Sequence, residues 1–310
     1  MLDSSDQYFS YWDSPYNNFN YSYVNTAVDQ YKYSTLAIDR LGIGNSSHGE
    51  PLNEIQAPIE IAAIAALTKM LRDGTFPGVK QIKKVVHIGH SFGSGQTYNL
   101  VNMDPSSSDG IVLTGFSGNG SFVPVFGAGA NFVQANDNQP FRLGSKIMGY
   151  SSVTNAYGAL DYDAALPTPL NYPNGYLANA NINSNQYNFF LPKFFDLGAL
   201  VAGEQTKQPV TPGELLTLGS VPMMNAYAGP VLVITGQNDV PFCGGNCLAT
   251  GDPMLASIPA AVKKSFPNAG DNFEAYIQPN TGHGLNFHYN QTGTYDVINC
   301  FLNGKGLASS

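Results

Sequence analysis

Short, largely apolar runs rich in β-branched residues recur along the chain. Each run is long enough for a strand and too short for a typical helix. This pattern predicts strands that are buried on both faces, as in a parallel sheet. The runs lie at residues 34–38, 84–88, 110–115, 229–236 and 273–277.

Apolar residues at helical spacing lie between these runs. Residues 53–72 are the clearest case, and Gly74 follows them as a typical helix terminator. Further helices are expected from residue 93 to about residue 101 and over about residues 295–302. Because strands and helices alternate, the pattern predicts an α/β protein with a mostly parallel sheet and flanking helices.

The alternation stops between residues 118 and 227. This stretch combines scattered Pro, Gly and Asn with many aromatic residues and weak strand signals. It predicts a lid or cap inserted into the sheet domain rather than a disordered linker, because the aromatic side chains need burial. We therefore expect a core made of residues 1–117 and 228–310, with residues 118–227 as the inserted lid.

Composition narrows the possible functions. The 310 residues are 43% hydrophobic, which is enough for a sizeable core. Lys and Arg number 14 against 22 Asp and Glu, and the resulting net charge of −8 disfavours binding to nucleic acid or to anionic lipid. A membrane span is not expected, because no run of about 18 apolar residues occurs.

Three cysteines are too few for a disulfide scaffold. Cys243 and Cys247 are separated by a short segment with two glycines, which predicts a small local disulfide. Cys300 lies in an apolar segment, so we expect a buried free thiol there. No further ligands lie near these cysteines in the sequence, so no metal site is expected.

The most informative motif is G-H-S-F-G at residues 89–93, between a predicted strand and a predicted helix. It fits G-x-S-x-G, in which a tight strand-to-helix turn exposes a nucleophilic serine. Bulky residues in place of Gly89 or Gly93 are expected to clash. Ser91 is thus the predicted nucleophile, and the Phe92 backbone N–H at the helix N-terminus is the predicted oxyanion donor.

A serine nucleophile needs a base, and five histidines are present. His283 is the predicted base, because it is flanked by glycine on both sides and follows the last predicted strand. His288 is the alternative. His87 is expected to pack within a strand, and His48 lies in an early loop that could line a pocket.

The base in turn needs a carboxylate to orient it. Asp239 follows the strand at residues 231–235 directly, at the sheet edge where sites form in α/β proteins. Asp252 and Asp271 are rivals, but neither directly follows a strong strand.

Three features resemble the α/β-hydrolase superfamily. The first two are the G-x-S-x-G turn and the chain order Ser91, Asp239, His283. The third, D-R-L-G-I-G-N-S at residues 39–46, is similar to the D-R-x-G-x-G-x-S loop after the fourth strand of that fold. Y-W-D at residues 11–13 resembles an uncharacterised, esterase-like subgroup from fungi and bacteria.

The resemblance covers most of the chain and implies an α/β-hydrolase fold with an inserted lid. It also implies a substrate site around Ser91, which His90 of the turn and Leu41 of the D-R loop are expected to contact.

The start of the chain departs from this pattern. The subgroup carries a His-Gly oxyanion motif just ahead of Y-W-D, and none stands before Tyr11. The strands that usually precede that motif are also absent, and no signal peptide is present. We therefore expect an N-terminally incomplete chain. The low charge and high Asn, Tyr, Ser and Gly content are typical of secretion, which we expect of a full-length parent.

These residues predict a serine hydrolase acting through an acyl-enzyme. The many aromatic residues and few charges of the lid favour a neutral, moderately hydrophobic carboxylic ester or lactone as the substrate, and amides remain possible. No cofactor motif is present. The alternative is a non-catalytic ligand-binding relative, or an inactive fragment of such a hydrolase.

Overall fold

The fold is built on a parallel sheet. The computed structural model describes residues 11–140, 142–144, 170–217, 219 and 222–308. Within them, β1 (Val86–His90), β2 (Gly110–Thr114), β5 (Val231–Gly236) and β6 (Phe273–Gln278) form a four-stranded sheet in the order β1-β2-β5-β6. All three neighbouring pairs are parallel, which confirms the predicted α/β class.

One face of the sheet is covered by α4 (Phe92–Met103) and the short helix η5 (Pro259–Ser265). Ile111 and Val231 point to this side, where they pack with Tyr98 and Phe266. β2 and β5 are buried along their whole length, which explains their continuously apolar sequences.

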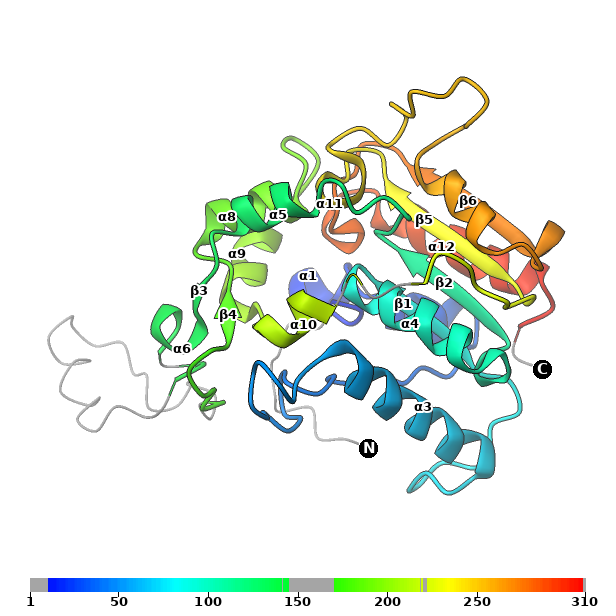
Figure 1. Cartoon of the computed structure of the whole chain (residues 1–310), viewed down its shortest axis with the longest axis horizontal. Helices are drawn as coiled ribbons and strands as arrows, with labels where there is room; N and C mark the ends of the chain where they lie inside the picture. Colours follow the sequence, from blue (N-terminus) through cyan, green and yellow to red (C-terminus); the bar gives the residue numbers. More distant parts are fainter. Residues whose placement is uncertain (1–10, 141, 145–169, 218, 220–221, 309–310) are drawn as a thin grey trace, which may run out of the picture.

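The opposite face is covered by α12 (Gln291–Gly304) and by the N-terminal segment. Val112 and Leu232 point to this side and pack with Tyr295 and Tyr23. The N-terminal segment contains three short helices: α1 (Tyr16–Phe19), α2 (Tyr23–Asn25) and η1 (Thr26–Gln30). Figure 1 shows α12 behind the sheet and α4 in front of it.

The predicted helix over residues 53–72 is present as α3 (Ala57–Asp73), which packs on α4. Its end follows the expected rule: Gly74 has φ 70° and donates its N–H to Met70 and Leu71. The remaining short helices of the core are η2 (Pro105–Ser107), α11 (Val240–Cys243), η6 (Gly270–Asn272) and η7 (Leu285–Phe287).

The predicted strand at residues 34–38 is wrong. These residues have no regular structure, and Leu36 and Ile38 are 47% and 43% exposed. A strand needs a neighbour for its backbone N–H and C=O groups, and no described strand pairs with this segment. The expectation that earlier strands are missing stays a prediction.

A second group of elements, here called the inserted group, lies between β2 and β5 in the sequence. Figure 1 shows α5, α8 and α9 together beside α11, beyond the carboxyl end of β5. The division of the chain into core and lid stays a prediction, and residues 145–169 lie outside the described residues. The elements are α5 (Val123–Ala130), β3 (Val133–Gln134), α6 (Ala135–Asn138), β4 (Leu177–Ala178), α8 (Ile182–Phe189), α9 (Leu197–Thr206) and α10 (Pro212–Thr217).

This group is hydrogen-bonded to the loop after β6. The Gly284 N–H donates to the Phe189 carbonyl over 2.9 Å, and the Tyr289 N–H donates to the Phe194 carbonyl over 3.0 Å. The end of α8 and the loop containing His283 are therefore joined along their backbones.

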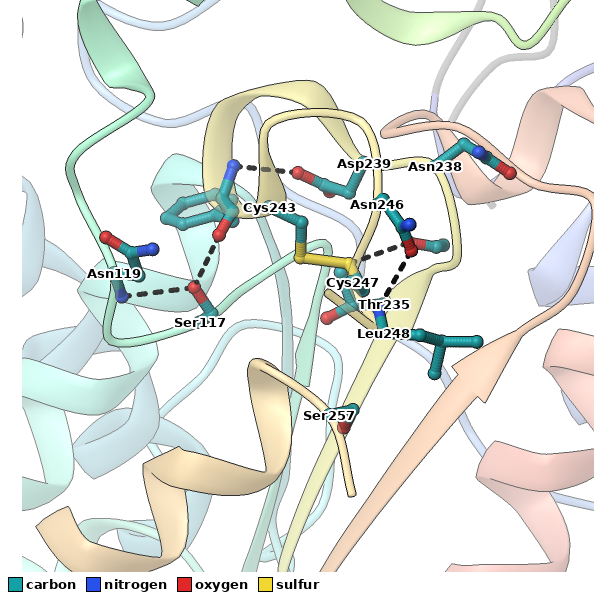
Figure 2. Close-up of a disulfide and its surroundings, with 12 residues drawn as sticks. Ser117, Asn119, Thr235, Asn238, Asp239, Cys243, Asn246, Cys247, Leu248 and Ser257 are labelled. Atoms are coloured by element: carbon teal, nitrogen blue, oxygen red, sulfur yellow. Dashed lines mark hydrogen bonds between the residues drawn. A yellow bond between two sulfur atoms is a disulfide. The ribbon is translucent and has the colours of Figure 1, made fainter. Parts of the chain in front are cut away.

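Cys243 and Cys247 form a disulfide, as their spacing predicts (Figure 2). Cys300, in contrast, is exposed on α12, so the expectation of a buried thiol is wrong. Its neighbours in α12, Asn299 and Phe301, face the interior instead. None of the helices in the described ranges is long and apolar enough to cross a membrane.

Candidate active site

Ser91 lies on the turn between β1 and α4. Its backbone has φ 53° and ψ −113°, a conformation that non-glycine residues rarely adopt and that is strained. The turn is hydrogen-bonded to the end of β2, because the Ser91 N–H donates to the Thr114 carbonyl over 2.9 Å. The Ser94 hydroxyl also donates to the carbonyls of Gly89 and Thr114, over 3.0 and 2.8 Å.

The two glycines of this turn differ in what they allow. A Cβ atom on Gly89 would lie 2.2 Å from the Gly93 carbonyl oxygen, so a side chain there is excluded. A Cβ atom on Gly93 would meet nothing within 4 Å. The expected clash is therefore confirmed at Gly89, whereas at Gly93 there is room for at least a Cβ atom.

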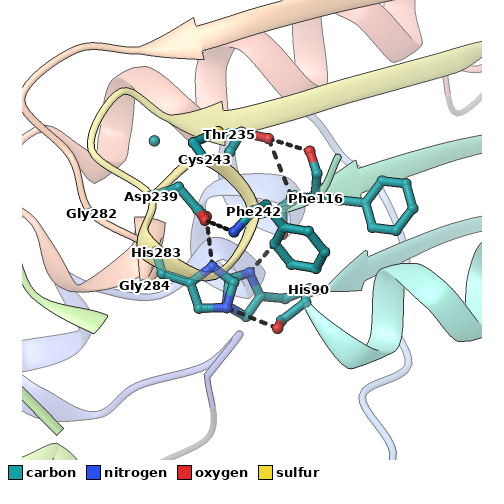
Figure 3. Close-up of polar contacts among 12 residues, drawn as sticks. His90, Phe116, Thr235, Asp239, Phe242, Cys243, Gly282, His283 and Gly284 are labelled. Atoms are coloured by element: carbon teal, nitrogen blue, oxygen red, sulfur yellow. Dashed lines mark hydrogen bonds and ion pairs between the residues drawn. The ribbon is translucent and has the colours of Figure 1, made fainter. Parts of the chain in front are cut away.

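The structure brings Ser91, His283 and Asp239 together, each just past a strand end. Figure 3 shows the Asp239 carboxylate pointing toward the His283 ring. The distance from Ser91 Oγ to His283 Nε2 is 2.8 Å, and His283 Nδ1 lies 2.6 Å from Asp239 Oδ2. In the neutral tautomer with the proton on Nδ1, the imidazole donates to the carboxylate and accepts from the serine hydroxyl. This chain of hydrogen bonds can pass a proton from serine to histidine.

Asp239 is completely buried, at 0% exposure. Its second oxygen, Oδ1, accepts the Phe242 backbone N–H over 2.9 Å, which also caps the first turn of α11. Both carboxylate oxygens therefore have hydrogen-bond donors, as a buried charge requires.

Phe92 is the first residue of α4, so its backbone N–H is at the helix N-terminus beside Ser91. This end of a helix carries partial positive charge and stabilises an anion. The Phe92 ring is held from the other side by Arg40, whose guanidinium carbon lies 5.0 Å from the ring centroid.

His90 lies against the predicted base. Its ring centroid is 4.8 Å from that of His283. On its other side the ring stacks on Tyr11 at 4.2 Å. Nδ1 is 3.1 Å from both the Tyr11 hydroxyl and the Thr114 hydroxyl. Burial lowers the pKa of His90 well below its usual value, which keeps this imidazole neutral.

Sequence reasoning did not assign Tyr11 to the site. Burial raises its pKa above the ordinary tyrosine value, so its hydroxyl stays protonated. The sequence pointed to Tyr11 only through the Y-W-D segment, and that segment supported the family resemblance without indicating a place in the site. The position of Tyr11 depends on a contact with His90, 79 residues away, which no local pattern could show.

Leu41 packs in a separate hydrophobic cluster. It packs against the cluster formed by Ile55, Tyr172 and Tyr176, where the D-R loop meets the inserted group. His48 lies in the same region, with its ring stacked 3.9 Å from that of Tyr172. A contact between Leu41 and substrate stays a prediction.

His288, the second candidate for the base, is engaged by the backbone. Its Nε2 accepts the N–H groups of Leu191 and Gly282 over 2.9 and 3.1 Å, and its Nδ1 lies 2.9 Å from the Gly284 carbonyl oxygen. Burial lowers the pKa of His288 to about 4. The ring therefore acts as a neutral hydrogen-bonding link between the inserted group and the His283 loop.

His87 and the two rival aspartates also lie outside the Ser91 cluster. His87 contacts the hydroxyls of Thr68 and Ser108 over 2.9 and 2.8 Å, as a packed strand histidine should. Asp252 and Asp271 are exposed. In the described part of the chain, no group of three His, Cys, Asp or Glu side chains could hold a metal ion.

Three phenylalanine rings from three different elements surround His283. Phe189 of α8 lies 5.6 Å from the imidazole, Phe242 of α11 lies 5.8 Å from it, and Phe126 of α5 lies 6.1 Å from it, between centroids. All three side chains are partly buried. The surroundings of the predicted base are thus strongly apolar.

Comparisons with known proteins bear on the fold. No protein-family model and no curated protein matches the sequence. The structure is similar to that of a methylesterase from Arabidopsis, with a TM-score of 0.55 and 12% identity, over 92% of this chain and 93% of the other.

It is also similar to a variant of tomato methylketone synthase I complexed with β-ketoheptanoate. The TM-score is 0.52 at 10% identity, over 92% of each chain. Together with the parallel sheet and its flanking helices, these likenesses show that the chain has the α/β-hydrolase fold.

Proposed function

We propose that this protein is a serine hydrolase that cleaves neutral, moderately hydrophobic carboxylic esters or lactones. The observation that carries the proposal is the continuous hydrogen-bond chain from Ser91 through His283 to Asp239, with links of 2.8 and 2.6 Å. A buried carboxylate, an imidazole and a serine on a strained turn form the arrangement that activates a hydroxyl as a nucleophile.

In the first half of the reaction, Ser91 Oγ attacks the carbonyl carbon while His283 Nε2 takes the hydroxyl proton. The carbonyl oxygen becomes an oxyanion, which the Phe92 N–H and the N-terminus of α4 stabilise. His283 then gives the proton to the departing alcohol, and an acyl-enzyme remains on Ser91. Asp239 orients the imidazole and stabilises its charged form.

In the second half, water attacks the acyl group and His283 takes a proton from that water. The tetrahedral intermediate collapses with return of the proton to Ser91 Oγ, and the carboxylic acid leaves. The neutral His90 beside His283 adds no positive charge that would oppose formation of the imidazolium.

The substrate class follows from what surrounds the base. Phe126, Phe189 and Phe242 offer apolar surface and no charge, which favours a neutral substrate with a hydrophobic group next to the scissile bond. The methylesterase among the similar structures supports ester hydrolysis at this coarse level. We further propose that the protein is secreted, since a local disulfide such as Cys243–Cys247 persists in oxidising compartments.

The test is labelling with a fluorophosphonate probe, read by intact mass and peptide mapping. We expect one adduct, on Ser91, and hydrolysis of short-chain p-nitrophenyl esters. Ser91→Ala should remove the adduct and lower kcat by about 10⁶-fold, with an unchanged circular dichroism spectrum. Unlabelled wild-type protein that is folded would instead favour a non-catalytic binding protein or an inactive fragment.

A further inference from the structure

We infer that the Cys243–Cys247 disulfide is a positioning element for the reaction, which holds the Asp239 carboxylate and the Phe242 ring against His283. The inference rests on the proposed function for its kinetic consequence. The geometric part of it, that the bridge fixes the Asp239–His283 contact, does not require that the protein hydrolyses an ester.

The disulfide lies immediately beside the predicted acid along the chain. Asp239 caps the first turn of α11, and Cys243 is the last residue of that same helix. Gly244 and Gly245 follow with φ 63° and 89°, which turns the chain back toward Cys247. Figure 2 shows the S–S bond crossing from the end of α11 to the returning chain.

Backbone hydrogen bonds close the same loop at its base. The Cys247 N–H donates to the Gln237 carbonyl, and the Gly245 N–H donates to the Asp239 carbonyl, both over 2.8 Å. The Asn238 side chain donates to the Gly245 carbonyl over 3.0 Å. Asp239 thus lies within the hydrogen-bonded loop from Gln237 to Cys247, and the disulfide covalently closes the second half of that loop, from Cys243 to Cys247.

The disulfide adds to hydrogen bonds and packing contacts in holding α11, whose own helical structure is weak. The helix has four residues, and helices this short are unstable by themselves because few hydrogen bonds offset the cost of ordering the backbone. Two consecutive glycines add further backbone freedom. Both sulfur-bearing residues are buried, at 4% and 0% exposure for Cys243 and Cys247, so the bridge belongs to the interior of the site.

The loop positions two groups that face His283. Asp239 contacts its Nδ1 over 2.6 Å, and the Phe242 ring lies 5.8 Å from the imidazole. Phe242 also links the loop to the chain after β2, because its carbonyl accepts the Ser117 hydroxyl over 3.0 Å. A shift of α11 would therefore move both the acid and one aromatic wall.

A bridge that only stabilised the fold would predict something different. Its removal would lower the unfolding temperature but would leave the rate per folded molecule unchanged. A positioning role predicts a lower rate that depends on the presence of the Asp239 carboxylate. A double-mutant cycle separates these cases.

The cycle compares Cys243→Ala/Cys247→Ala in the wild-type chain and in Asp239→Ala, with kcat and KM measured on a p-nitrophenyl ester. We expect kcat to fall about 10- to 100-fold in the first background, the loss typical of a small misplacement. In Asp239→Ala, itself expected to lose about 10⁴-fold in kcat, removal of the bridge should lower kcat far less, because only the displacement of the Phe242 ring then remains. Cys300→Ser, at the exposed free thiol of α12, is the matched control and should leave kcat unchanged.

Equal losses in both backgrounds would overturn the inference, since the bridge would then act without Asp239. An unchanged kcat in the wild-type background would overturn it as well. If the double alanine variant does not fold, folded wild-type protein is reduced with a phosphine and the released thiols are alkylated and counted by mass. Equal losses of kcat on reduction of wild type and Asp239→Ala, or an unchanged kcat on reduction of wild type, would again overturn the inference.

A measurement without turnover separates this inference from the proposed function. In protein labelled with ¹⁵N-histidine, the Nδ1–H of His283, donated to Asp239, gives a far-downfield proton resonance that Asp239→Ala removes. We expect the resonance to broaden or vanish without the bridge. An unchanged position and width would refute the positioning role even if the wild-type chain hydrolysed no ester.

Discussion

The imidazoles of His90 and His283 lie in contact, with their ring centroids 4.8 Å apart and their planes at 38°. Gly115 makes this possible, because a Cβ atom there would come within 2.6 Å of the His90 ring and 3.1 Å of the His283 ring. The predicted base, which becomes positively charged in the proposed mechanism, therefore lies beside a second titratable ring. It can do so because His90 is buried and neutral.

The charge of residue 90 should control the rate. His90→Arg would place a permanent positive charge about 5 Å from the forming imidazolium, which costs about 3 kcal/mol at an effective dielectric constant of 20. We expect kcat/KM for a p-nitrophenyl ester to fall about 200-fold at neutral pH. His90→Phe is the matched control, because it keeps an aromatic ring on Tyr11 and should stay within tenfold of wild type. Similar rates in the two variants would contradict this account.

The two glycines of the serine turn should respond differently to alanine. Gly89→Ala forces a Cβ atom to 2.2 Å from the Gly93 carbonyl, so we expect a loss of about 3 kcal/mol or more in the free energy of unfolding. Gly93→Ala enters open space in the first turn of α4 and should be neutral or stabilise by about 0.5–1 kcal/mol. Urea unfolding of both variants checks this, and comparable destabilisation would refute it.

The Phe189 ring should contribute to the selection of hydrophobic esters. Phe189→Ala removes the ring 5.6 Å from His283, and we expect kcat/KM for a butyrate ester to fall about tenfold, through loss of about 1–2 kcal/mol of apolar contact. The acetate ester should lose less. Tyr187→Ala, on the same helix but 48% exposed, is the control and should change neither value. Equal losses for acetate and butyrate would rule out a selective role.

Acid should destabilise the fold through His288. Its pKa is lowered from 6.5 to about 4 by burial, so the folded protein favours the neutral ring. The stabilisation is complete above pH 6.5 and is lost as the pH falls toward 4, by about 3 kcal/mol at most. His288→Gln offers an uncharged acceptor to the N–H groups of Leu191 and Gly282 and should flatten this dependence. Urea unfolding at pH 7 and pH 4.5 tests it; identical pH dependence in both proteins would contradict the prediction.

Glu60 gives the free energy of unfolding an opposite pH dependence, so wild type must be compared with His288→Gln at each pH. Glu60 is buried beside Arg40 and Gln96, and burial raises its pKa to about 7. This carboxyl group stabilises the fold less as the pH rises through 7. The difference between wild type and His288→Gln at each pH cancels this contribution.

The parts of the site that depend on strand order could be predicted from sequence. A serine after β1, an aspartate after β5 and a histidine after β6 must meet, because parallel strands end at one edge of the sheet. Local glycine patterns singled out Ser91 and His283, which the structure places within hydrogen-bonding distance of each other.

The parts that depend on tertiary packing could not be predicted. Residues 34–38 have the composition of a strand, yet no described strand pairs with them. The stack of Tyr11 on His90 joins segments that share no local pattern. The role of His288 as an acceptor for two backbone N–H groups likewise depends on Leu191, 97 residues earlier in the chain.

The backbone hydrogen bonds between the end of α8 and the His283 loop couple the position of α8 to the position of the predicted base. The Gly284 N–H donates to the Phe189 carbonyl, and the Tyr289 N–H donates to the Phe194 carbonyl. The inserted group is therefore hydrogen-bonded to the His283 loop at two points. An outward swing of α8 wide enough to admit a bulky ester would pull on the residue next to His283. The geometry of the predicted base is therefore tied to the position of α8.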